Sequence, residues 1–131
     1  MTAPRWIDRR ALELLHNESL AEHGGAAGLR DENLLDSALA RPLNLRAYEG
    51  VADLVRLAAA YAFGLARDHP FVDGNKRAAL IAAGLFLGLN GLRLTANQVD
   101  AHETILRLAA GELDETVLAD WIRRHSEPRA R

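Results

Sequence analysis

The 131-residue sequence contains no cysteine and few aromatic residues. Without cysteine, disulfide bonds and thiolate zinc sites are excluded, and no redox-active thiol is available. Hydrophobic residues make up 49% of the chain but aromatic residues only 5%, so leucine and alanine must fill most of the core. That composition favours helices, and a chain of this length is expected to form one compact domain.

The sequence also lacks an excess of basic charge and a long apolar run. Its formal net charge is −2, whereas proteins that bind nucleic acid usually carry a clear basic excess. Met1–Trp6 has no apolar segment of the kind found in signal peptides. No uninterrupted apolar run reaches the roughly 18 residues that suggest a membrane span. We therefore predict a cytoplasmic protein with neither a nucleic acid nor a membrane as a direct partner.

Two apolar runs flank one short polar stretch, and this arrangement organises the chain. The runs cover residues 54–65 and 78–89, and neither has a polar face, which predicts two buried central helices. The polar stretch, residues 68–77, becomes a loop between them. Pro70 should end the first helix at the residue before it, and Asp73 or Asn75 can cap the second helix.

Lys76 and Arg77 stand where local physics disfavours them. The macrodipole at a helix start disfavours a cation by about 0.3 to 1 kcal/mol. A local cost without a local gain tends to mark a functional site. Free backbone N–H groups at a helix start, together with two cations, favour an anion, and the sequence therefore predicts a phosphate pocket.

The polar stretch holds the residue types that phosphate chemistry requires. His69, Asp73 and Arg77 follow one another at intervals of four, so one small volume could hold all three. The imidazole of His69 is the natural proton acceptor, the carboxylate of Asp73 suits Mg²⁺, and the guanidinium of Arg77 can grip phosphate oxygens. Lys76 can add a mobile charge, and Phe71 should anchor the loop in the core.

Plainer interpretations compete with this one. Alone, His69 would be read as a helix-ending histidine, and Asp73 can act as a cap and a ligand at once. The glycines at residues 24–28 are read as a helix stop and turn, because no strand precedes them and no Lys-Ser/Thr follows. The remaining histidines lack metal-site spacing and are predicted to be mostly solvated residues on helix faces: His16, His23, His102 and His125.

Residues 69–77 read His-Pro-Phe-Val-Asp-Gly-Asn-Lys-Arg. This stretch resembles the signature of the Fic/Doc superfamily, His-x-Phe-x-(Asp/Glu)-x-Asn-(Gly/Lys)-Arg, with every specified position filled. Lys76 stands where Fic adenylyltransferases usually have Gly and where Doc-like (death-on-curing) toxins have Lys. The resemblance to Doc-like toxins extends over most of the chain, including Gly28–Asp31, Ser37–Pro42 and Gly111–Asp114.

The resemblance implies a toxin of a type II toxin–antitoxin module. Doc-like toxins are kinases that use Mg²⁺ and ATP to phosphorylate a threonine of elongation factor Tu, which stops translation. Carried over by position, His69, Asp73 and Arg77 are catalytic, with His69 as the base and Asp73 as the Mg²⁺ ligand. Lys76 selects phosphoryl over adenylyl transfer by removing room for the α-phosphate. The same positions assign four residues to nucleotide and phosphate binding: Gly74, Asn75, Lys76 and Arg77.

The resemblance also implies a cognate antitoxin with a disordered segment that folds on binding. Trp6, Leu12 and Leu15 are guesses for its binding surface. Two alternative functions stay open. One is adenylyl transfer in the manner of Fic proteins, and the other is a catalytically inactive co-regulator that only binds the antitoxin.

The rest of the chain predicts an all-α bundle of about six helices. Asp8 should cap a first helix that stops at Gly24. Asp31 should cap a second helix that ends before Pro42. The alternating pattern at residues 43–48 is a weak strand signal; by the resemblance it would form a flap that holds a target segment, and an irregular loop is equally compatible.

The C-terminal third predicts two further helices. Thr95 should start one that ends by Gly111, and Asp114 should open the last, amphipathic one. Residues 1–125 would then form the helical domain. Residues 126–131 are polar and are predicted to be a disordered tail.

Overall fold

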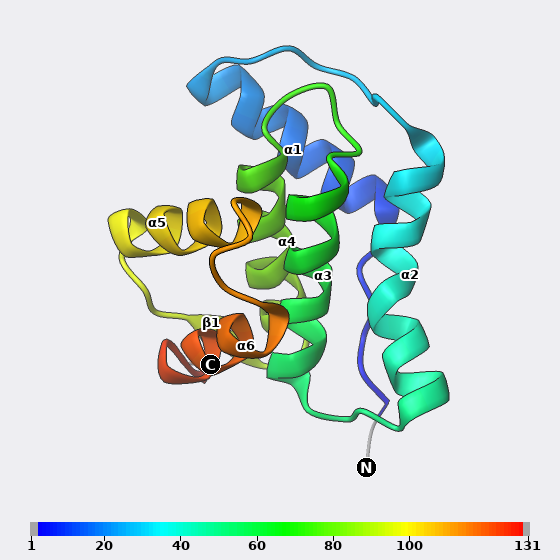
Figure 1. Cartoon of the computed structure of the whole chain (residues 1–131), viewed down its shortest axis with the longest axis vertical. Helices are drawn as coiled ribbons and strands as arrows, with labels where there is room; N and C mark the ends of the chain where they lie inside the picture. Colours follow the sequence, from blue (N-terminus) through cyan, green and yellow to red (C-terminus); the bar gives the residue numbers. More distant parts are fainter. Residues whose placement is uncertain (1–2, 130–131) are drawn as a thin grey trace.

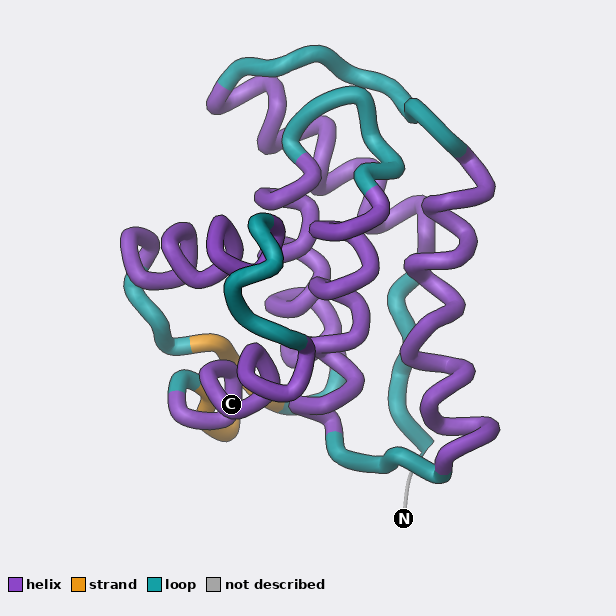
Figure 2. The backbone as a smooth tube through the Cα atoms, viewed as in Figure 1, coloured by secondary structure: helices purple, strands orange, loops and turns teal. Residues whose placement is uncertain are grey.

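The computed structural model describes residues 3–129. In this range the chain forms six α-helices and one two-stranded antiparallel sheet. The prediction of an all-α bundle is confirmed, and Figure 2 shows how small the strand content is. In chain order the elements are α1 (Arg9–His23), α2 (Glu32–Glu49), α3 (Leu54–Asp68), α4 (Asn75–Leu89), β1 (Leu92–Leu94), α5 (Gln98–Ala109), α6 (Glu115–Arg124) and β2 (Ser126–Pro128).

Helix α3 lies at the centre, as its mostly apolar sequence predicts. It packs against α4, α2 and α6, and Figure 1 shows α3 and α4 side by side, with α2 on one side and α5 and α6 on the other. Small side chains allow close approach between the helices. A Cβ atom at Gly64 would lie only 3.2 Å from the Cα of Ala38 on α2. None of the helices within residues 3–129 is both long enough and apolar enough to span a membrane.

Helix α2 differs from the prediction because it continues through Pro42 to Glu49. The expected helix end before Pro42 is wrong, and so are both interpretations of residues 43–48 as a strand or an irregular loop. A proline inside a helix removes one backbone hydrogen bond. Leu35, Ala38 and Pro42 are nevertheless buried on one face of α2, which packs on α3. Burial of that face offsets the missing bond.

The C-terminal segment also differs from the prediction. Ser126–Pro128 forms β2 and pairs with β1, so the expected disorder is wrong for these residues. Arg129 extends the contact by donating its backbone N–H to the carbonyl of Gly91 at 2.8 Å. Residues 130–131 lie outside the described range.

Helix α5 starts at Gln98 rather than at Thr95. Its N-cap is Asn97, whose side chain accepts a hydrogen bond from the N–H of Asp100. The N–H of Thr95 is donated instead to the carbonyl of His125, at 2.6 Å. Thr95 therefore lies before the helix, tied to a residue 30 positions away in the sequence.

Helix α1 begins after Asp8 and ends at Gly24 as predicted, but one residue on its buried face differs from the prediction. His16, predicted to be solvated, is only 1% exposed. Of the three residues guessed to bind the antitoxin, Leu15 is exposed and Trp6 is half-buried. Leu12 is completely buried, and the ring of Trp6 stacks on that of Phe86 with centroids 5.9 Å apart.

Candidate active site

The loop between α3 and α4 begins with a residue in an uncommon conformation. His69 is the C-cap of α3 and has a φ of 51°, the only positive value at a non-glycine residue in the described range. Pro70 disfavours the helical region for the residue before it, which explains why α3 ends here. Arg30 holds this turn, because its guanidinium donates to the carbonyls of His69 at 2.7 Å and Asp68 at 2.8 Å.

An extended segment, residues 24–31, runs alongside the loop, and Figure 1 shows it passing over the loop at one end of the bundle. Leu29 and Phe71 form an antiparallel β-bridge, and the N–H of Val72 donates to the carbonyl of Gly28 at 3.0 Å. The extended backbone beside the loop is therefore this segment and not residues 43–48, where the resemblance had implied a flap.

Phe71 and Asn75 lock the middle of the loop. Phe71 is 3% exposed and Asn75 is 8% exposed. The Asn75 side chain accepts from the N–H of Phe71 at 2.9 Å and donates to its carbonyl at 3.0 Å. Both ends of the Asn75 amide are therefore engaged within the loop. The backbone N–H of Asn75 has no acceptor within residues 3–129 and is available to a phosphate.

Asp73 is exposed, and its carboxylate is oriented by two backbone groups. One oxygen accepts from the N–H of Gly74 at 2.8 Å, and the other accepts from the N–H of Ala26 at 3.3 Å. Within residues 3–129 no three His, Asp or Glu side chains cluster as a metal site would require. Mg²⁺ is commonly held by one or two carboxylates together with substrate phosphates and waters. The chain therefore fits Mg²⁺ only as part of a site shared with a phosphorylated substrate.

Helix α4 starts without a side-chain cap. Its N-cap is Gly74, in the left-handed conformation with φ 73°, so the prediction that Asp73 or Asn75 would cap the helix is wrong. The first helical hydrogen bond runs from the N–H of Ala78 to the carbonyl of Gly74. In the described part of the chain, the three preceding N–H groups, at residues 75–77, have no acceptor. A helix start of this kind favours anions.

Lys76 and Arg77 lie in this uncapped first turn of α4, as the sequence predicts. Neither forms a salt bridge with another residue in the described range. Arg77 is exposed and Lys76 is half-buried. Both cations are therefore available to an anionic ligand.

Arg77 also borders a cavity of about 610 Å³ between α4, β1 and α5. Ligand pockets typically have volumes of about 300 to 1,000 Å³. The walls are mostly apolar, with Leu80 and Ile81 on α4, and His102 and Glu103 add polar groups from α5. Sequence reasoning did not predict this cavity, because it forms only where α5 packs against α4.

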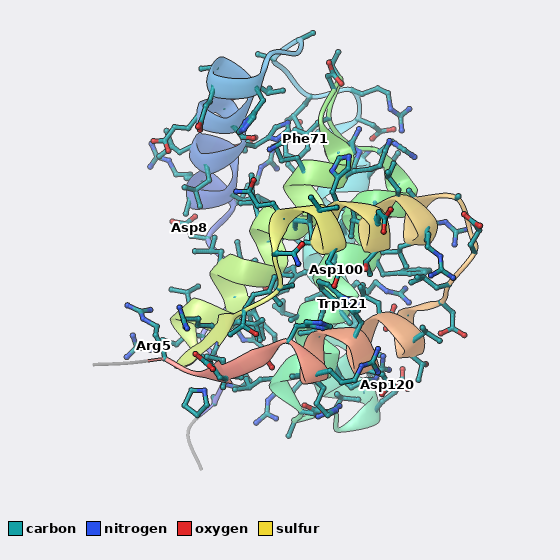
Figure 3. All side chains as sticks on the ribbon, turned by 90° about the vertical axis from the view of Figure 1, so that its left-hand side faces the viewer. Arg5, Asp8, Phe71, Asp100, Asp120 and Trp121 are labelled. Atoms are coloured by element: carbon teal, nitrogen blue, oxygen red, sulfur yellow. The ribbon has the colours of Figure 1, made fainter. Side chains whose placement is uncertain are left out.

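His16 is a second residue that sequence reasoning missed. Its Nε2 lies 3.0 Å from the carbonyl oxygen of Asp73, and its ring lies 4.1 Å from the ring of Phe71. Figure 3 shows Phe71 beside α1. Burial lowers the pKa of His16, outweighing the hydrogen bond to the Asp73 carbonyl and the Asp73 charge, which raise it. The available signal was periodicity, since His16 follows Leu12 by four on the buried face of α1.

These features define an all-α domain whose candidate active site is a tightly held loop leading into an uncapped, buried helix. The Fic/DOC family profile matches residues 6–87, which include that loop. The chain belongs to the Fic/DOC family.

Two relatives are similar over most of the chain. Over 120 residues it is 35% identical to the protein kinase Doc of Escherichia phage P1, an alignment that covers 92% of this chain and 94% of the relative. Over 107 residues it is 43% identical to the toxin Doc of Mycolicibacterium smegmatis, and the alignment covers 80% of each protein.

Proposed function

We propose that this protein is the toxin of a toxin–antitoxin module and that it acts as a Doc-like kinase, transferring the γ-phosphoryl group of ATP to a protein hydroxyl. The names of the two relatives, protein kinase Doc and toxin Doc, support this class. The observation that carries the proposal is the start of α4. There, within residues 3–129, three backbone N–H groups without acceptors and two cations without salt-bridge partners directly follow the loop.

Each residue of the loop then has a task. His69 accepts the proton of the attacking hydroxyl while the oxygen bonds to the γ-phosphorus and the bond to the bridging oxygen of ATP breaks. Arg77 and the N–H groups of residues 75–77 hold the phosphate oxygens. Asp73, together with the substrate phosphates, would hold Mg²⁺, which supplies positive charge that stabilises the transferring phosphoryl group.

Asn75 and Phe71 shape the loop before substrate binds and take no part in the bond-making step. Because the Asn75 side chain bonds to both backbone groups of Phe71, the loop is preorganised when substrate arrives. Preorganised donors need no reorientation during the reaction. In this proposal Asn75 reaches phosphate through its backbone, and its side chain maintains the loop.

Lys76 distinguishes phosphoryl from adenylyl transfer. A lysine at this position is typical of Doc-like sequences, whereas Fic adenylyltransferases usually have glycine there. Its side chain would occupy the space that an α-phosphate needs in the adenylylating orientation. This favours a nucleotide bound with its γ-phosphate toward His69.

We further propose a threonine of elongation factor Tu as the acceptor, which places the activity in the cytoplasm, and a cognate antitoxin as the regulatory partner. The antitoxin is proposed because one relative, from Mycolicibacterium smegmatis, is a toxin. Of the three residues guessed for its binding surface, Leu12 is buried and Trp6 packs on Phe86, whereas Leu15 is exposed.

The test is one mass spectrum. The full chain is incubated with ATP, Mg²⁺ and elongation factor Tu, and the mass of the factor is measured together with the position of the modified residue. A gain of one phosphoryl group on a threonine supports the proposal. A gain of one adenylyl group would establish Fic-type transfer instead, and an unmodified factor would reject this target.

Expression in cells separates an enzyme from an inactive antitoxin-binding co-regulator. The wild-type chain should stop growth, and Arg77→Ala should abolish that effect while the protein still folds, as judged by circular dichroism. Growth arrest that persists in the Arg77→Ala variant would contradict the role of the α4 start.

A further inference from the structure

We propose that His16 on α1 is a positioning residue for the candidate active site, holding residues 71–74 through a hydrogen bond to the carbonyl of Asp73 and through packing of its ring. The part of this inference that concerns reaction rate rests on the proposed function. The part that concerns the loop does not.

Three contacts join this one side chain to the loop. The ring of His16 lies 4.1 Å from the ring of Phe71 at an angle of 36°. Nε2 lies 3.0 Å from the carbonyl oxygen of Asp73. Cε1 lies so close to Gly74 that a Cβ atom there would be only 2.8 Å away. The imidazole therefore touches three of the four residues that carry the chain from Phe71 into α4.

The chemistry of the contact determines which tautomer is present. A carbonyl oxygen can only accept a hydrogen bond, so Nε2 must carry the proton. Nδ1 is fully buried and has no hydrogen-bond partner in the described part of the chain. A charged imidazole would bury an N–H donor at Nδ1 without an acceptor, which is costly. His16 is therefore the neutral Nε2–H form.

A buried polar group with one nitrogen unsatisfied is a poor choice for packing alone. Leucine or methionine would fill the same space without that cost. What an apolar side chain cannot supply is the hydrogen bond to Asp73. That bond holds the peptide group between Asp73 and Gly74. The N–H of the same peptide group donates to the Asp73 carboxylate. His16 thereby orients the Asp73 side chain through its own backbone.

The kinetic test uses three substitutions at His16 that separate hydrogen bonding from packing. In His16→Gln the amide nitrogen can reach the position of Nε2, in His16→Asn it is one carbon short, and His16→Leu fills the space without a donor. Removing groups that orient a metal ligand typically costs about 10- to 100-fold in metal affinity or activity. We expect a fall in kcat of about 10-fold or more for His16→Leu and His16→Asn, and recovery of most of the rate in His16→Gln.

The matched control is His23, on the same helix. Its Nδ1 lies 3.1 Å from the carbonyl of Ser19, within its own helix. His23→Gln should leave kcat unchanged. Thermal unfolding of every variant shows whether the fold is intact. If the Gln, Asn and Leu variants lose activity equally, or only in proportion to lost stability, the positioning role is rejected.

A spectroscopic test does not depend on activity. With ¹⁵N-labelled imidazole, the NMR spectrum should show Nε2 protonated, Nδ1 unprotonated and a ring proton that exchanges slowly with solvent. The opposite tautomer, or rapid exchange of that proton, would reject the hydrogen bond to Asp73. If the wild-type chain transfers no phosphoryl group but shows this spectrum, the proposed function fails and the inference about the loop stands.

Discussion

The start of α4 differs from the starts of the other five helices in the described range. Each of those five has an Asp or Asn N-cap whose side chain accepts a hydrogen bond from a backbone N–H in the first turn. The caps are Asp8, Asp31, Asp53, Asn97 and Asp114. Helix α4 has Gly74 instead, no side-chain cap, and two cations in its first turn.

The difference shows that the free N–H groups at a helix start can serve either stability or ligand binding. A side-chain cap satisfies free N–H groups and stabilises the protein. Leaving those groups free costs stability but keeps donors for a ligand. The five capped helix starts contribute to the stability of the bundle, and the start of α4 is left available for an anion. Mutations at the two kinds of start should therefore have opposite consequences.

The largest expected effect is at the loop that precedes α4. His69→Ala should reduce the rate of phosphoryl transfer by about 10² to 10⁴, the usual contribution of a general base. The His69 side chain is exposed and forms no hydrogen bond with the rest of residues 3–129, so the free energy of unfolding should change little. Single-turnover kinetics and urea unfolding measure the two quantities. A rate equal to that of wild type would remove His69 from the mechanism.

At a capped helix start we expect the reverse, a loss of stability with an unchanged transfer rate. Asp114→Ala removes the acceptor for the N–H of Val117, 2.9 Å away, and should lower the free energy of unfolding by about 0.5 to 2 kcal/mol. The transfer rate should stay at the wild-type value. Asp114→Asn is the control, since asparagine caps equally well. A loss of activity without a loss of stability would show that the α6 start is not merely structural.

A smaller effect is expected from removing a cation at the α4 start. Lys76→Gln should raise the free energy of unfolding by about 0.3 to 1 kcal/mol, because a positive charge is unfavourable at the positive end of a helix dipole. The same substitution should weaken ATP binding, measured by calorimetry. Arg107→Gln is the matched control, because Arg107 lies in the last turn of α5, where the dipole favours a cation and its removal should destabilise.

The smallest effect concerns pH. The unfolded chain protonates His16 near pH 6.5, and burial lowers the pKa of His16 in the folded state. As pH falls below 6.5 the unfolded state binds a proton that the folded state excludes, so stability should decrease until the folded pKa is reached. Urea midpoints measured on both sides of this pH should show a smaller decrease in His16→Gln. Identical pH profiles for the two proteins would contradict the burial of a neutral His16.

Much of the fold was predictable because its signals are local. Asp8, Asp31 and Asp114 cap the helices for which they were predicted, since a cap needs only its own first turn. Pro70 ends α3 through its steric effect on His69. The two apolar runs became α3 and α4 because neither has a polar face to present to water.

The errors share a different cause. Helix α2 continues through Pro42 because its buried face packs on α3. Residues 126–128 become a strand because β1 supplies hydrogen-bond partners more than 30 positions away. His16 is buried because Phe71 and Asp73 lie over it. Each outcome depends on a neighbour that local sequence does not reveal.

The features of the candidate site also separate into those set by local sequence and those set by tertiary neighbours. The spacing of His69, Asp73, Lys76 and Arg77 and the two apolar helices around them could be predicted from the sequence alone. Spacing and hydrophobicity are properties of the chain itself. The clamp from Arg30, the support from His16 and the cavity beside Arg77 were decided by tertiary structure. They require α1, the segment at residues 24–31 and α5 to meet the loop, and only the packing of the core brings these segments together.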